Sequence, residues 1–93
     1  MTVAINKWDA AEHLDSDEAI AAYLADVMES GDRNHIVHAL NTVARARGMT
    51  QIAKDAGIAR QALYKSLGED GNPTLSTLLG VLKSLGLSLA VKA

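Results

Sequence analysis

Apolar residues recur every three or four positions along most of this chain, which is the spacing of helices that each bury one face. In residues 49–67 this pattern breaks at Gly57 and Ile58 and then restarts. Gly57 can adopt the left-handed backbone conformation that closes a helix, and Ile58 can fill the angle between two helices. The stretch therefore predicts two short helices joined by a tight turn, as in a helix-turn-helix. Its apolar positions are Ile52, Ala53, Ala56, Leu63 and Leu67.

Three further stretches, residues 15–30, 32–48 and 74–86, repeat the helical spacing. Each begins with an Asp or a Thr whose side chain can cap a helix, and each has a glycine at or just after its end. In the first stretch Asp15 is the expected cap, and Glu18 follows it in capping-box register. The apolar positions of the three stretches are Ala19, Ile20, Tyr23, Leu24, Val27 and Met28, then Ile36, Val37, Leu40, Val43 and Ala44, then Leu75, Leu78, Leu79, Leu82 and Leu85.

The segments between and beyond these helices have other patterns. Turn residues fill 68–73 and predict a loop, whereas residues 87–92 alternate large apolar with small or polar side chains, which predicts a strand. A lone strand needs a partner, either residues 2–6 or the same tail of a second subunit. An antiparallel pair of tails about a two-fold axis would make a dimer. Trp8 is either a core residue or an anchor on the surface of a partner.

The composition fits one all-α domain. Ninety-three residues can bury one core and leave no room for a second fold. With 48% hydrophobic residues, one Trp, two Tyr and no Phe, that core must be built from Leu, Ile, Val and Ala, which suits packed helices. We therefore expect a compact helical bundle over residues 1–93 with a short C-terminal β-strand.

Several classes of function find no support in the residues. The chain has no cysteine, which excludes a disulfide framework and a thiolate metal site. His35 and His38 lie one helical turn apart, but no further metal ligand clearly shares their face, and no nucleophile elbow, phosphate loop or zinc signature is present. No signal peptide and no apolar stretch of about 18 residues is found. We expect a cytoplasmic protein that is not an enzyme and has no cofactor, metal or membrane association.

The second helix of residues 49–67 would present Arg60, Gln61, Tyr64 and Lys65 outward, and no acidic residue lies between Arg60 and Leu67. Arg and Gln match the edges of guanine and adenine in the major groove, whereas Lys and Tyr suit the phosphates nearby. An ordinary solvated helix face would more often include Glu and Asp. This face therefore favours DNA binding over two short amphipathic helices that merely flank a glycine.

The net charge of −2 hides two regions of opposite sign. Residues 1–34 carry eight acidic and two basic residues, a balance of −6, whereas residues 35–93 carry seven basic and three acidic residues, a balance of +4. This asymmetry indicates two surfaces with different partners, one basic for phosphates and one acidic for a cationic partner. An acidic helix that serves only solubility would give the same charges.

Three segments carry a resemblance to a known family. Residues 39–53, residues 57–67 and the run Gly71-Asn72-Pro73-Thr74 resemble the addiction-module antidote proteins, which are small antitoxins with a Cro/cI-type (XRE-like, lambda repressor-like) helix-turn-helix. Residues 19–24 with Gly31-Asp32 are also similar, so the resemblance covers nearly the whole chain. It implies an antitoxin that is encoded beside a RelE/ParE-type toxin, neutralises that toxin and represses its own operon as a dimer.

By position, the recognition helix of that family maps onto residues 59–67. Ala59 stands where a Ser or Thr often caps this helix and contacts a phosphate, which puts that cap and that contact in question. The pair Thr50 and Gln51 lies closer to Gly57 than the helix-opening Gln of typical phage repressors does, which weakens a phosphate role for Gln51. The candidate DNA-binding residues are Thr50, Gln51, Arg60, Gln61, Tyr64 and Lys65.

We therefore expect a single-domain DNA-binding antitoxin of a type II toxin-antitoxin module. It would have an acidic N-terminal helical region (1–34) that covers a cationic toxin, a DNA-binding core (35–86) and a C-terminal strand (87–92). Two alternatives stay open: a stand-alone helix-turn-helix transcriptional regulator without a toxin partner, and an interaction module that kept the fold and lost DNA binding. A basic product of the adjacent gene would favour the antitoxin. The operator, the chemistry of the toxin and the dimer geometry stay open.

Overall fold

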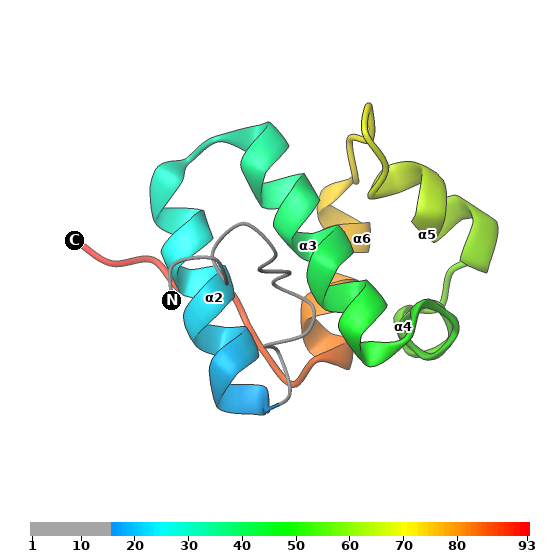
Figure 1. Ribbon diagram of the computed structural model, residues 1–93, viewed down its shortest axis with the longest axis horizontal. Coiled ribbons are helices and arrows are strands. Elements are labelled where there is room, and N and C mark those ends of the chain that lie inside the picture. The colour runs from blue at the N-terminus through cyan, green and yellow to red at the C-terminus, as the bar shows by residue number, and fades with distance from the viewer. Residues whose placement is uncertain (1–15) are drawn as a thin grey trace, which may run out of the picture.

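The computed structural model describes residues 16–93, and these form five helices (Figure 1). α2 packs against α3, and α4 contacts α3, α5 and α6. α4 therefore joins the α2–α3 pair to α5 and α6. The expected helical fold class is confirmed. None of the described helices could cross a membrane, because each is too short or too polar. The helices are α2 (Asp17–Ser30), α3 (Arg33–Arg47), α4 (Met49–Ala56), α5 (Arg60–Ser66) and α6 (Leu75–Ser84).

The helix caps follow the prediction with one exception. Asp32 caps α3 and Thr74 caps α6, each by accepting backbone N–H groups of the first turn. α2 is instead capped by Ser16, whose hydroxyl accepts the N–H of Ala19 at 3.0 Å. The prediction of Asp15 is wrong by one position, because Ser and Asp cap equally well and the extended backbone of Ser16 directly precedes the helix.

The core is aliphatic, as the composition predicts. α2 contributes Ile20, Leu24 and Val27, and these side chains meet the inner face of α3. A second group comes from α4, α5 and α6 and includes Leu63, which is fully buried. The remaining core residues are Ala39, Leu40, Val43, Ala44, Met49, Ile52, Ala53, Leu67, Val81, Leu82 and Leu85.

Two leucines of α6 contradict the predicted inner face. Leu75 and Leu79 are 66% and 44% exposed, whereas Val81, Leu82 and Leu85 are buried. The buried residues lie on one stripe of the helix, and Leu79 lies about 100° from Leu78, outside that stripe. Leu75 occupies the first position of α6, where no other described element covers it. α6 therefore carries an apolar side that faces solvent.

The predicted C-terminal strand is not found. Residues 87–93 leave the end of α6 as an extended tail that runs beside α2 (Figure 1). Leu87 still packs on the core and donates its N–H to Leu82 at 2.8 Å, but Leu89 is 47% and Val91 99% exposed. A strand requires a second extended segment, and residues 16–86 supply none. The alternatives for residues 2–6 and for Trp8 fall outside the described residues.

Candidate nucleic-acid interface

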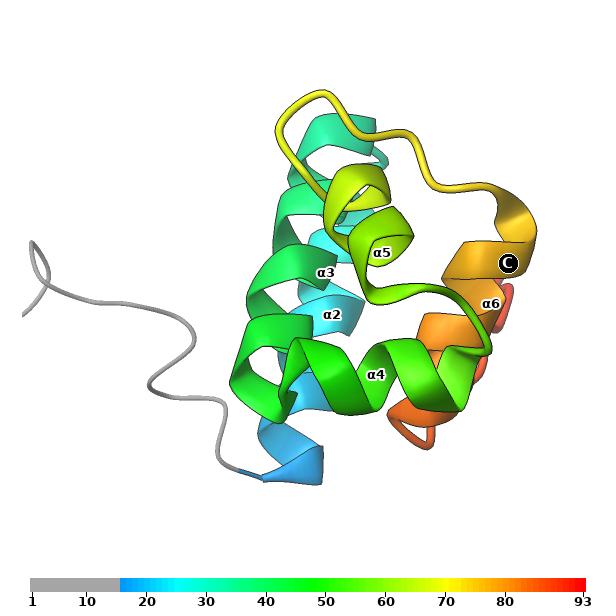
Figure 2. The same cartoon turned by 90° about the vertical axis from the view of Figure 1, so that its right-hand side faces the viewer.

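The turn between α4 and α5 has the geometry that the sequence predicts. Gly57 has a left-handed backbone (φ 73°, ψ 30°), and its N–H is bonded to the carbonyl groups that end α4. Ile58 donates its N–H to Ala53 at 3.0 Å, and its side chain packs against the core. The chain therefore turns sharply within residues 57–59, and α5 leaves α4 at a fixed angle (Figure 2).

α5 is attached to the core on one side only. Leu63 is fully buried, and Leu67, which follows the helix, is 2% exposed. The remaining side chains of the helix from Arg60 to Lys65 are exposed. Figure 2 shows α5 in front of the other elements in that view, with α4 beneath it. The predicted outward side chains Arg60, Gln61, Tyr64 and Lys65 thus share one accessible helix face.

Arg60 and Tyr64 form a pair on this face. They lie four positions apart, and the guanidinium carbon of Arg60 lies 5.2 Å from the centre of the Tyr64 ring. One guanidinium nitrogen donates to the Tyr64 hydroxyl at 3.3 Å. The ring therefore supports the guanidinium without using all of its five donors, so the remaining N–H groups can bind an acceptor such as guanine O6 and N7.

Thr50 and Gln51 lie on the first turn of α4, and both are exposed. Gln51 already forms a hydrogen bond within the protein. Its amide nitrogen donates to the carboxylate of Asp55 at 2.8 Å, one turn further along the same helix. Asp55 is absent from the predicted site residues, although its position four residues after Gln51 could have revealed the pair. An exposed carboxylate at this place repels phosphate, so α4 contributes less positive charge than its Lys54 suggests.

The start of α5 departs from a capped helix, as expected. Ala59 occupies the cap position with an extended backbone, and no side chain accepts a hydrogen bond from the first turn. The free N–H groups of that turn therefore depend on solvent or a ligand. The far end is better held, because Asn41 on α3 donates its side-chain N–H to the carbonyl of Leu67 at 3.1 Å.

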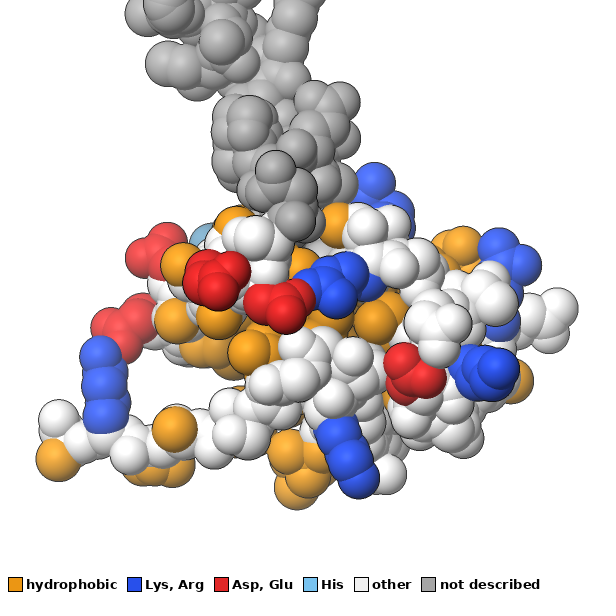
Figure 3. All heavy atoms as spheres, turned by 90° about the horizontal axis from the view of Figure 1, so that it is seen from below, with side chains coloured by type: hydrophobic (Ala, Val, Ile, Leu, Met, Phe, Trp, Pro, Cys, Tyr) orange, Lys and Arg blue, Asp and Glu red, His pale blue; other side chains and the backbone are white. Residues whose placement is uncertain are grey.

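The two regions of opposite charge occupy different sides of the described chain. α2 carries Asp17, Glu18, Asp26 and Glu29 and no basic residue, and all four acidic side chains are exposed. Figure 3 shows most of the acidic side chains in view on the side where α2 lies in Figure 1, whereas most Lys and Arg side chains, with one acidic side chain among them, lie on the other side. The Arg47 guanidinium pairs with Asp17 and so links the end of α3 to the start of α2.

Other chemistry finds little basis in the described residues. His35 and His38 are both exposed on α3, and within residues 16–93 no three His, Cys, Asp or Glu side chains come together as a metal site requires. Among the described residues, the α5 face is the surface most suited to bind a ligand, because its cationic and amide donors lie together on a helix that follows the turn at Gly57.

Comparison with known proteins identifies a family. The model of a family described as "Probable addiction module antidote protein" matches residues 4–93. A protein of Haemophilus influenzae that bears only the name "Uncharacterized protein" is 46% identical over 92 residues, which cover 99% of this chain and 95% of that relative. No solved structure matches the chain. Because the match spans almost every residue, the chain belongs to the family of probable addiction-module antidote proteins.

Proposed function

We propose that this chain is the antitoxin of a type II toxin-antitoxin module, which binds its own operator through a Cro/cI-type helix-turn-helix formed by α4 and α5. Membership of an antidote family implies a cognate toxin in general. The observation that carries the DNA-binding half is the exposed face of α5, where Arg60, Gln61, Tyr64 and Lys65 lie together without an acidic residue. A RelE/ParE-like toxin is the partner that the sequence resemblance suggests.

The dimensions of α5 suit this role. An α-helix with its side chains is about 10–12 Å across, which matches the width of about 12 Å of the major groove of B-DNA, and the seven residues of α5 form about two turns that can lie in it. Arg60 would donate to a guanine and Gln61 would pair with an adenine, because these side chains match the two bases. Lys65 and the hydroxyl of Tyr64 would contact the phosphates beside them.

Repression of an operon by this surface calls for two copies of the chain. Helix-turn-helix dimers read two half-sites about 34–36 Å apart, so that two recognition helices enter successive turns of the major groove. We propose that the copies meet through α6, because Leu75 and Leu79 are exposed one turn apart and α6 has no acidic residue to repel its copy.

A mobility-shift titration tests the DNA-binding half. The full chain is mixed with a fragment of its own promoter and with a shuffled fragment of equal length, at about 50 and 200 mM salt. We expect tighter binding to the promoter, and weaker binding to both fragments at the higher salt because cations released from the phosphates drive association. Equal affinity for the two fragments would contradict operator recognition.

Copurification with the product of the adjacent gene tests the antitoxin half. We expect the two proteins to elute as one complex, and expression of the partner alone to stop growth. Specific promoter binding without any complex would favour the second function, a stand-alone helix-turn-helix regulator.

A further inference from the structure

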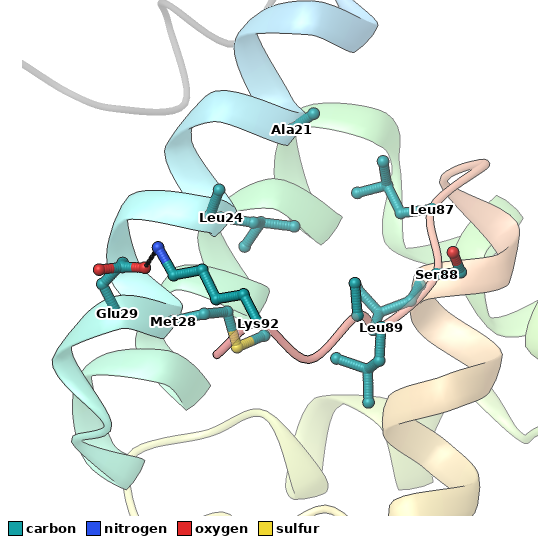
Figure 4. Close-up of a pocket in the computed structure, with 11 residues that line it drawn as sticks. Ala21, Leu24, Met28, Glu29, Leu87, Ser88, Leu89 and Lys92 are labelled. Carbon is teal, nitrogen blue, oxygen red and sulfur yellow. Dashed lines mark ion pairs between the residues drawn. The ribbon is translucent and has the colours of Figure 1, made fainter.

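An apolar groove runs between α2 and the C-terminal tail (Figure 4). It has a volume of about 550 Å³ and is open to solvent. Leu24 and Leu82 form part of its lining and are almost fully buried, so the groove reaches the hydrophobic core. Met28 from α2 and Leu87 from the tail line its walls. A surface of this kind is suited to bind apolar side chains.

The tail wall of the groove is loosely held. The backbone hydrogen bonds that residues 16–93 make outside their helices end at Leu87, and none involves residues 88–93. Val91 is 99% exposed, so it contributes no packing. A wall with so few contacts can move aside for a bound segment at small cost.

The rim of the groove carries one carboxylate, which already pairs with a cation. The ammonium group of Lys92 crosses from the tail to the carboxylate of Glu29, as Figure 4 shows. Their side chains are 80% and 57% exposed, and ion pairs so exposed to water stabilise little. A cation from another chain can therefore replace Lys92. The other acidic side chains of α2 extend the same negative field.

We propose that this groove is where the cognate toxin docks, through a segment with apolar side chains at its centre and Lys or Arg at its margins. The inference rests on the proposed antitoxin function and adds the surface and the chemistry of the partner. Apolar side chains would enter between Leu24 and Leu87, while a cation at the margin would meet the carboxylate of Glu29.

Charge argues against a second copy of this chain as the occupant. A symmetric contact through α2 would bring the four acidic residues of one copy against the same four of the other, which is repulsive. A cationic partner meets no such repulsion. α2 and the C-terminal tail, which line most of the groove, lie on the opposite side of the bundle from α5 in Figure 1, so a toxin seated there leaves the proposed DNA-binding face free.

Two matched pairs of variants of the full chain test the groove. Ala25→Arg places a cation in the groove from an exposed position, and Ala22→Arg places the same side chain at an exposed position of α2 that does not line the groove. Glu29→Gln removes the carboxylate on the rim, and Asp26→Asn removes one that does not line the groove. Binding to the purified product of the adjacent gene is measured by calorimetry. Thermal unfolding and the promoter mobility shift monitor the fold.

We expect Ala25→Arg to weaken binding of that product at least tenfold and Glu29→Gln to weaken it about threefold, with both controls within twofold of the unchanged chain. All four variants should keep the melting temperature and the promoter affinity.

If the unchanged chain does not bind the product at all, the antitoxin function itself fails and the groove assignment with it. If it binds and Ala25→Arg binds equally well, only the groove assignment fails. A change in the mass of the free protein with Ala25→Arg, with toxin affinity intact, would assign the groove to a second copy and overturn the proposal.

Discussion

The guanidinium of Arg60 lies against the ring of Tyr64 and therefore begins any encounter with DNA already aligned along α5. A long side chain that is held in advance loses less rotamer freedom when it binds. Lys65 has no such support among the hydrogen bonds of the described residues and acts as a point charge. At the residue scale, the two cations of one helix should therefore contribute differently, one to base recognition and one to general affinity.

Arg60→Ala should weaken binding to the operator by about 1–3 kcal/mol and reduce the preference for one base, whereas Lys65→Ala should weaken all sequences alike. The measurement is a mobility shift on the promoter fragment and on its shuffled counterpart. Lys92→Ala is the matched control, since it removes an exposed cation of the C-terminal tail instead and should leave both affinities unchanged. Equal losses on both fragments with Arg60→Ala would show that this side chain does not read bases.

Asp55 is expected to oppose the proposed function of the helix on which it stands. Its carboxylate accepts from Gln51 and lies exposed on α4. Asp55→Asn keeps an acceptor for Gln51 but removes one negative charge near the phosphates, so DNA affinity should rise about two- to fivefold at low salt and less at high salt. Glu29→Gln removes a charge from the far side and should leave DNA affinity unchanged. No gain with Asp55→Asn would place α4 away from the phosphates.

At the scale of single elements, the loop that follows α5 is held from two sides. Arg33 of α3 donates to the carbonyl of Gly71 at 3.2 Å, and Gly71 is buried against the last turn of α5. A Cβ atom at Gly71 would overlap the backbone carbonyl of Ser66. The position of the end of α5 therefore depends on glycine at position 71, eleven residues after the first residue of the helix, because a side chain there would overlap the helix backbone.

Gly71→Ala should lower the free energy of unfolding by about 1–3 kcal/mol, because the clash is with backbone and the end of α5 must shift to relieve it. Urea unfolding followed by circular dichroism gives the value. Asn72→Ala changes the exposed neighbour and should stay within about 0.5 kcal/mol of the unchanged chain. A Gly71→Ala protein as stable as the Asn72→Ala protein would contradict this account of the loop.

Patterns of neighbouring residues predicted the helices and the turn between α4 and α5. They failed for features that depend on residues far away in the chain, such as exposure and ion pairs. Gly57, Ile58 and Leu63 were predictable because their roles depend on neighbours within a few positions. The exposure of Leu75 and Leu79 was not, because a leucine has the same identity whether or not another element covers it. The link between Asp17 and Arg47 joins residues 30 positions apart, and no periodicity encodes it.

At the scale of the whole molecule, the described helices divide into a half that contains α2 and α3 and a half that contains α4, α5 and α6, with α4 contacting α3 between them. The apolar groove lies between α2 of the first half and the C-terminal tail, whereas the α5 face belongs to the second half. The exposed Leu75 and Leu79 of α6 lie in the second half. The proposed dimer contact would therefore join the halves that carry the proposed DNA-binding faces and leave both grooves free.

Leu75→Lys should convert the proposed dimer into a monomer, because it places a cation where two copies of an apolar side chain would meet. Sedimentation analysis should show the mass halved, and promoter binding should fall at least tenfold because the half-sites no longer bind together. Ser76→Lys, at the next exposed position, should leave the dimer intact. A Leu75→Lys protein of unchanged mass would locate the dimer contact elsewhere.

The attachment of α5 through Leu63, with Leu67 just beyond its end, has a consequence for how such proteins diverge. Five of the seven positions of the helix face outward and carry no share of the core. Under the proposed function, substitutions there would alter which nucleotides are preferred at little cost in stability, so a duplicated copy could acquire a new regulatory target without first evolving a more stable scaffold. Transplanting residues 60–65 between relatives would then exchange their promoters.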